Sequence, residues 1–313
     1  METALRVLGA DPATVLSDAD RRQLDESAST WPPLYPPPAL FTPRPPARVA
    51  EGWLNLGQLY SAEWCEEATR RINGRIDVEP PGTEPFSVGH EGEILRLGNL
   101  FNKVNDDGFF DAVPVQPKLL AAAVHVIGGS DFRLFSLNTR GSPPGLGEQA
   151  LHTDHGPNPG ALETPPRYSG INSVLMLSPF TEQNGSTRMV SGWHRTGDTQ
   201  EALADPSAPH PDEQRMLGPA GTVVVFSVHL LHSGTRNDSE QTRSCIHTSF
   251  MRRDRPQQVN QREAAAPQTV ARLVRTAKGR ATMAVMGMQD EDEPHLRDDY
   301  VINDRPDSEA PRL

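Results

Sequence analysis

The middle of the chain alternates apolar and polar residues in short runs, which is the pattern of β-strands. Asp131-Phe-Arg-Leu-Phe-Ser-Leu-Asn-Thr-Arg140 alternates with a period of two. Further strands are predicted at residues 150–154, 171–177, 186–190, 222–228 and 243–252. Clusters of Gly, Pro, Asn and Ser separate these runs, and no helices alternate with them. The pattern therefore indicates an antiparallel sandwich or barrel.

The first third of the chain is predicted to be mainly helical. A short helix is expected at residues 17–29, and a second begins near Ser61, whose hydroxyl suits an N-cap, and runs to about Gly74. A third spans residues 116–129, with a proline near its start and glycine at its end. A strand is expected at Trp53, and another helix at 261–279. The fold class is therefore mainly β with flanking helices.

Composition divides the chain into three predicted segments. Residues 1–50 include the run Trp31-Pro-Pro-Leu-Tyr-Pro-Pro-Pro, which should form an extended surface arm because proline interrupts helices and central strands. Residues 51–255 hold the predicted globular domain, and residues 256–313 hold a helix and an acidic tail. The proline-containing loop 78–92 and the polar insertion 195–219 are candidate lid or specificity segments.

Charge and hydropathy narrow the possible partners. The net charge is −11, which argues against nucleic acid or an anionic membrane as the main partner. Mean hydropathy is −0.54, and no apolar run approaches the roughly 18 residues of a membrane span. With two cysteines and no signal-like start, we expect a reducing, cytoplasmic setting. A small molecule is the expected partner.

A His-x-Asp step, His152-Thr-Asp154, carries the candidate chemistry. On a strand, both side chains would point to one face, and neutral imidazole with carboxylate suits a divalent ion such as Fe(II). The third ligand is His229 or His232, which both follow the strand at 222–228, and spacing does not choose between them. If the next residues close a hairpin, Arg243 returns beside the metal. There its guanidinium could hold one end of a dicarboxylate that chelates the ion, which suits 2-oxoglutarate.

Three ordered motifs resemble the phytanoyl-CoA dioxygenase-like Fe(II)/2-oxoglutarate oxygenases. The resemblance spans roughly residues 50–255 and rests on Leu151-His-Thr-Asp154, on Asn184-Gly-Ser-Thr-Arg-Met-Val-Ser-Gly-Trp-His194, and on Leu230-Leu-His-Ser-Gly-Thr-Arg-Asn237 followed by Arg243. It implies a double-stranded β-helix (a cupin-like jelly roll) that uses Fe(II), 2-oxoglutarate and O2. It further implies that His152, Asp154 and His232 bind iron and that Arg243 binds 2-oxoglutarate. Lys103 is similar to a family lysine that also contacts this cosubstrate.

The resemblance implies hydroxylation of an aliphatic carbon of a small molecule, such as a secondary-metabolite intermediate, with release of succinate and CO2. Asp154 disfavours halogenation, because related halogenases carry a small residue there. Ser191-Gly-Trp-His194 departs from the family's Pro-Gly-Ser-His, and we expect this to alter packing only. The same site could perform desaturation, cyclisation or epimerisation.

Two rival functions remain open. A catalytically silent jelly roll would bind a small molecule without turnover, and a zinc hydrolase would use the same ligands but leave Arg243 unexplained. Among the other histidines, His155 and His194 are expected to be structural, and His229 to lie at a strand end or beside a ligand. Several arginines could still form a local basic pocket, namely Arg140, Arg167, Arg188 and Arg195.

Overall fold

The computed structural model describes residues 2–24, 51–76, 107–156, 168–196, 198–258 and 260–288. The proline run at 31–38, the loop 78–92, Lys103 and the acidic tail lie outside these residues. None of the described helices has the length and apolar character needed to cross a membrane.

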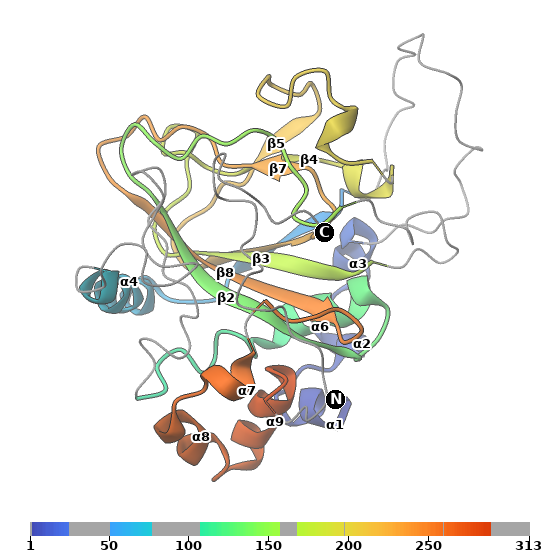
Figure 1. Ribbon diagram of the computed structural model, residues 1–313, viewed down its shortest axis with the longest axis vertical. Coiled ribbons are helices and arrows are strands. Elements are labelled where there is room, and N and C mark those ends of the chain that lie inside the picture. Colours follow the sequence, from blue (N-terminus) through green and yellow to red (C-terminus); the bar gives the residue numbers. More distant parts are fainter. Residues whose placement is uncertain are drawn as a thin grey trace.

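Two antiparallel sheets form the centre of the protein (Figure 1). The larger has the strand order β1-β6-β3-β8-β2, and the smaller has the order β5-β4-β7. Strand bounds in the larger sheet are Trp53–Gln58 (β1), Phe132–Ser142 (β2), Gly170–Met176 (β3), Thr222–Ser227 (β6) and Arg243–Arg252 (β8). Those in the smaller sheet are Arg188–Val190 (β4), Glu213–Arg215 (β5) and His232–Ser233 (β7).

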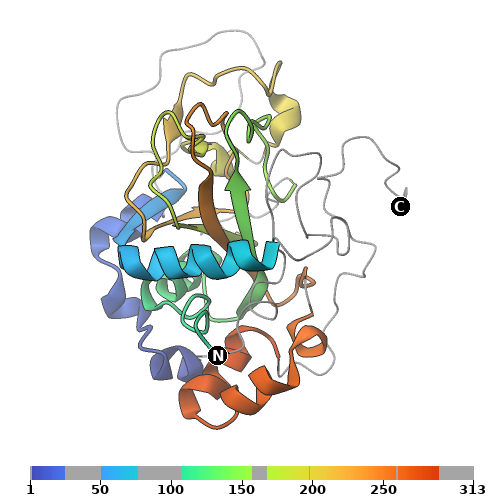
Figure 2. The same ribbon diagram turned by 90° about the vertical axis from the view of Figure 1, so that its left-hand side faces the viewer.

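Helices α1, α2, α6, α7, α8 and α9 lie on the side of the larger sheet away from the smaller one, and α4 lies beside β2 and β8 at the left (Figure 1). Near the termini, α1 and α9 contact each other, while α6 packs on β2, β3, β6 and β8. The helices are Glu2–Val7 (α1), Pro12–Val15 (α2), Asp18–Leu24 (α3), Ala62–Ile76 (α4), Pro117–Ile127 (α6), Gln261–Ala264 (α7), Pro267–Leu273 (α8) and Ala277–Val285 (α9). Figure 2 shows α4 lying across the sheet when the molecule is turned.

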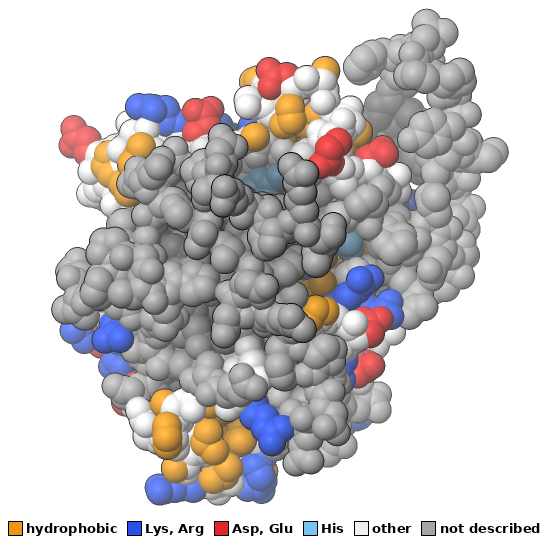
Figure 3. Space-filling model, viewed as in Figure 1, with side chains coloured by type: hydrophobic (Ala, Val, Ile, Leu, Met, Phe, Trp, Pro, Cys, Tyr) orange, Lys and Arg blue, Asp and Glu red, His pale blue; other side chains and the backbone are white. Residues whose placement is uncertain are grey.

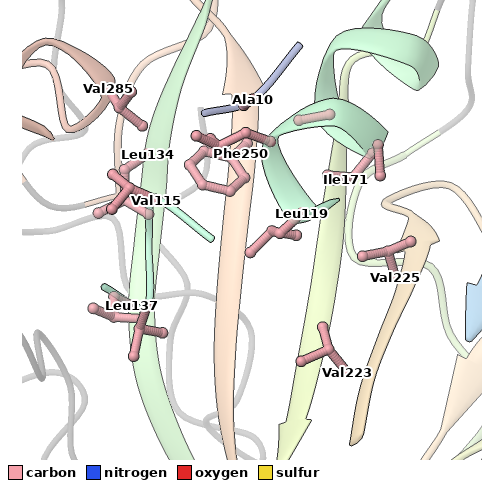
Figure 4. Packing of buried hydrophobic residues seen from close by; sticks show 14 of the residues in the cluster. Ala10, Val115, Leu119, Leu134, Leu137, Ile171, Val223, Val225, Phe250 and Val285 are labelled. Carbon is pink, nitrogen blue, oxygen red and sulfur yellow. The ribbon is translucent and has the colours of Figure 1, made fainter. Parts of the chain in front are cut away.

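Alternation along the central strands explains how the larger sheet buries both faces. On β6, Val223 and Val225 join the core beneath the helices, while Val224 and Phe226 face the space between the sheets. Figure 4 shows Val223 and Val225 with Leu119 of α6 and Phe250 of β8 in the helix-side core. Because both faces are covered, β6 is almost continuously apolar. The predicted mainly β jelly roll is confirmed.

Most predicted elements are observed, and local chemistry sets their ends. The Gln116 side chain accepts a hydrogen bond from the Leu119 amide at the start of α6, and Gly128 ends this helix with a φ of 81°. The Ser61 hydroxyl accepts one from the Trp64 amide at the start of α4. Strands β2, β3, β6 and β8 lie within two residues of their predicted bounds.

Two predicted elements are wrong. The segment 150–154 is not a strand, because it makes only an isolated bridge from His152 to His232. The predicted helix at 261–279 is three short helices, α7, α8 and α9. Pro267 has no amide hydrogen, so it begins α8 instead of continuing α7. Thr276 then caps α9 by accepting a hydrogen bond from Gly279.

Candidate metal centre

His152, Asp154 and His232 come together at the open edge between the two sheets. A pair of backbone hydrogen bonds, each 2.9 Å long, joins His152 to His232 on β7, and their ring centroids lie 4.6 Å apart. The Asp154 carboxylate is 3.7 Å from His152 Nε2 and 3.6 Å from His232 Nε2. One ligand atom from each residue lies within 4.8 Å of the others. The bridge therefore brings His152 beside His232, and Asp154 lies close to both rings.

Hydrogen bonds orient both imidazoles in the same way. His152 Nδ1 lies 3.0 Å from the Ala150 carbonyl oxygen, and His232 Nδ1 lies 2.9 Å from that of Leu230. A carbonyl oxygen only accepts, so each Nδ1 carries the proton. The lone pair is then on Nε2, which faces Asp154 in both cases.

Asn172 on β3 and Ser249 on β8 fix the carboxylate. The Asn172 side-chain amide donates a hydrogen bond to Asp154 Oδ2, and the Ser249 hydroxyl donates one to Asn172 Oδ1. The two residues are Cα partners across the sheet. Sequence reasoning missed both, although a polar residue inside the apolar run 171–177 was an available signal.

The electrostatics favour a neutral imidazole at His232 beside an ionised carboxylate at Asp154. Burial lowers the pKa of His232 to about 4. Burial alone would raise the pKa of Asp154, but His232, His152 and Arg140 outweigh it and keep this pKa below its usual range. The side chains of His152 and Asp154 are 28% and 29% exposed, so one side of the group is open. Two imidazole nitrogens and one carboxylate fit a divalent ion with open coordination positions.

Arg243 begins β8, as predicted, and its side chain is buried between the sheets. Its Nη2 donates hydrogen bonds of 2.8 Å to Ser142 Oγ and to the Gly185 carbonyl, and its guanidinium lies 4.6 Å from the centre of the Phe180 ring. Its buried Nε has no hydrogen-bond partner. The predicted hairpin before it is wrong, because β7 pairs with β4 in the smaller sheet whereas β8 belongs to the larger one. The connection crosses between sheets.

The other histidine candidates are not in the ligand group, although His155 acts electrostatically on Asp154. His229 Nδ1 lies 3.0 Å from the Gly156 carbonyl, and His229 is not in the candidate ligand group. His155 packs against the Phe135 ring, and His194 is buried against Tyr168. Arg188 is already paired with Glu213 at 3.3 Å, so it adds no free charge to a basic pocket. Lys103 and Arg167 lie outside the described residues.

Charged groups of both signs are interspersed over the described surface on the face seen in Figure 3. Histidine side chains are visible in its upper half, whereas acidic and basic groups lie mainly around the edges.

Comparison with known proteins supports the fold and identifies the family. The chain is 30% identical over 122 residues to Dioxygenase FUM3 of Gibberella moniliformis, an alignment covering 38% of this chain and 39% of that relative. The crystal structure of EctD from S. alaskensis in its apoform matches with a TM-score of 0.51 and 16% identity, over 66% of this chain and 75% of that one. A model of the family described as phytanoyl-CoA dioxygenase (PhyH) matches residues 50–245, more than half of the chain. The chain therefore belongs to the phytanoyl-CoA dioxygenase family.

Proposed function

We propose that this protein is an Fe(II)- and 2-oxoglutarate-dependent dioxygenase that hydroxylates an aliphatic carbon of a small molecule. The observation that carries the proposal is the open group of His152, Asp154 and His232, found in the same barrel interior as the buried Arg243. Membership of the family supports the same chemistry.

In this proposal, the two histidines and Asp154 bind Fe(II) as a facial triad and leave three positions open. The Nδ1 hydrogen bonds of the histidines hold Nε2 towards the ion, and Asn172 holds the carboxylate. When bound, iron and 2-oxoglutarate together supply the activation of O2 that oxidises a carbon–hydrogen bond, with succinate and CO2 as by-products. The protein itself binds and orients these groups and excludes water from the site.

Arg243 binds the far carboxylate of 2-oxoglutarate through its guanidinium. Its Nε is buried without a partner, so an incoming carboxylate would satisfy it. The Phe180 ring and the Ser142 hydroxyl hold the guanidinium in place. Lys103 is proposed as a further contact to the cosubstrate. Apolar residues between the two sheets, including Val224 and Phe226, exclude water from the space beside the Arg243 guanidinium.

An anaerobic titration tests the metal and cosubstrate sites. Adding Fe(II) and then 2-oxoglutarate should produce a visible metal-to-ligand charge-transfer band, and His152→Ala should abolish it. Arg243→Gln should weaken 2-oxoglutarate binding by about 10- to 100-fold, because it removes a charge-assisted hydrogen bond worth about 1.5–3 kcal/mol. No band in folded wild-type protein, or a band that persists in His152→Ala, would count against the proposal.

The reaction is tested by succinate release across a panel of small molecules, read together with product mass. A gain of one oxygen establishes hydroxylation. A loss of two hydrogens would indicate desaturation or cyclisation, and an unchanged mass with altered stereochemistry would indicate epimerisation. Bound ligands without any turnover would support a silent binding protein, and zinc-supported turnover without O2 would support a hydrolase.

A further inference from the structure

Arg140 is a second arginine that faces the space between the two sheets. On β2, Leu137 belongs to the core on the helix side of the larger sheet, and Thr139 pairs with Ile246 of that same core. Because successive side chains alternate across a strand, Arg140 points to the opposite, inner side. Its Cα partner is Cys245, which belongs to the core between the sheets.

The register places Arg140 between the two parts of the proposed site. Along β8, the inward positions run from Arg243 through Cys245 and His247 to Ser249, which is linked to Asp154 through Asn172. Arg140 pairs with Cys245, one inward position from Arg243 on the way to Ser249. Its guanidinium therefore lies on the path that a ligand reaching from the triad to Arg243 would follow.

Arg140 is half-buried, and its guanidinium, unlike those of Arg188 and Arg243, has no hydrogen-bond or ion-pair partner among the described residues. Its Nε is buried without a hydrogen bond, and no acidic residue in the described part of the chain forms an ion pair with it. Arg188, in contrast, pairs with Glu213, and Arg243 bonds to Ser142 and Gly185. A buried donor without a partner is costly, so the Nε of Arg140 is available to an anion.

Electrostatics agree with this position. Burial is the main cause of the lowered pKa values of His232 and Arg243, and the positive charge of Arg140 lowers both further. The same charge also helps His232 and His152 to keep Asp154 ionised against the effect of burial. One guanidinium thus acts on both the triad and Arg243.

Arg133, Arg140 and Arg243 are the arginines at inward positions of β2 and β8. Arg133 lies at the far end of β2, where it donates a hydrogen bond to the Arg255 carbonyl. Arg140 acts electrostatically on both Asp154 and Arg243, so its guanidinium can meet an anion held between them. We propose that Arg140 binds a carboxylate of a ligand held at the triad, separate from the carboxylate that Arg243 takes. This inference rests on the proposed function.

Two sources could supply this carboxylate, namely the iron-proximal end of 2-oxoglutarate or the small-molecule substrate. Binding of 2-oxoglutarate and of 2-oxopentanoate, which lacks the far carboxylate, separates them in anaerobic Fe(II)-loaded protein. If the cosubstrate is the source, Arg140→Gln weakens both acids by about 10- to 100-fold, whereas Arg243→Gln weakens only 2-oxoglutarate.

If the substrate is the source, Arg140→Gln leaves both affinities unchanged. The protein loaded with Ni(II) and 2-oxoglutarate is then tested for thermal stabilisation by a panel of carboxylic acids and their primary amides. Wild-type protein should bind acids of the panel in preference to the amides, and Arg140→Gln should lose that preference.

Two control variants frame the result. Arg140→Lys keeps the charge and should retain most of the affinity. Arg140→Met removes the charge as Arg140→Gln does, and it replaces Arg140→Gln if the latter does not fold. Arg70→Gln removes the same charge from the outside of α4, where the side chain is 70% exposed, and should change nothing.

The inference is overturned by either of two results, both of which include unchanged affinities of Arg140→Gln for the two 2-oxo acids. In the first, Arg140→Gln also keeps the wild-type preference for acids over amides. In the second, wild-type protein binds none of the carboxylic acids of the panel. Loss of the charge-transfer band in wild type would instead remove the proposed function itself.

Discussion

Replacing Asn172 tests how the protein holds its metal-binding carboxylate. Asn172→Ala removes the amide that donates to Asp154 Oδ2 and leaves the Ser249 hydroxyl without its acceptor. A hydrogen bond to a charged group contributes about 1.5–3 kcal/mol, so the dissociation constant for Fe(II) should rise about 10- to 100-fold. This range matches the losses seen when groups that orient metal ligands are removed. Ser249→Ala keeps the amide and should cost less, about 2- to 10-fold.

The assay is a competition titration of Co(II) against a chelating dye, with near-ultraviolet circular dichroism to confirm that each variant is folded. Asn138→Ala is a matched control, because Asn138 is a buried asparagine on the inner side of β2 that bonds to Gln258 and not to the triad. Its metal affinity should stay within about twofold of wild type. The reasoning is refuted if Asn172→Ala also stays within that range, or if Asn138→Ala loses as much affinity.

Three further predictions concern stability and reactivity. Gly221 has a φ of 86°, and a Cβ there would collide with the Tyr60 carbonyl, so Gly221→Ala should lower the free energy of unfolding in urea by at least about 2 kcal/mol. The control Gly74→Ala lies in open space on α4 and should stabilise the protein slightly. Equal effects of the two variants would contradict this prediction. Burial lowers the pKa of His194 to about 3, below the unfolded value near 6.5, so the protein keeps this stability above pH 6.5 and loses it as the pH falls towards 4. Urea unfolding of the apo-protein at several pH values should show that His194→Gln loses stability less steeply, by up to about 1.4 kcal/mol per pH unit. An unchanged slope would contradict this prediction. Burial raises the pKa of Cys65 to about 11, so this thiol should react with Ellman's reagent only after unfolding, and rapid labelling of native protein would disprove its protection.

Local chemistry made several elements predictable. Strand β8 begins and ends at its predicted residues, and it is buried on both faces between β2 and β3. Helix α6 carries its own stop and start signals in Gln116, Pro117 and Gly128. The single helix predicted at 261–279 failed at Pro267. This residue lacks the amide hydrogen that a continuing helix needs, so a new helix begins there.

The sequence by itself determined the mainly β fold, the family and the residue types suited to a metal. Spacing along the chain left His229 and His232 open, and only the family resemblance pointed to His232; the tertiary structure then forms the bridge to His152 at His232. It also paired Asn172 with Asp154, from β3 and the segment after β2. Arg140 was one of several candidate basic residues until the strand register placed it inside the barrel. These relations depend on contacts between distant segments, which the order of residues along one chain does not specify.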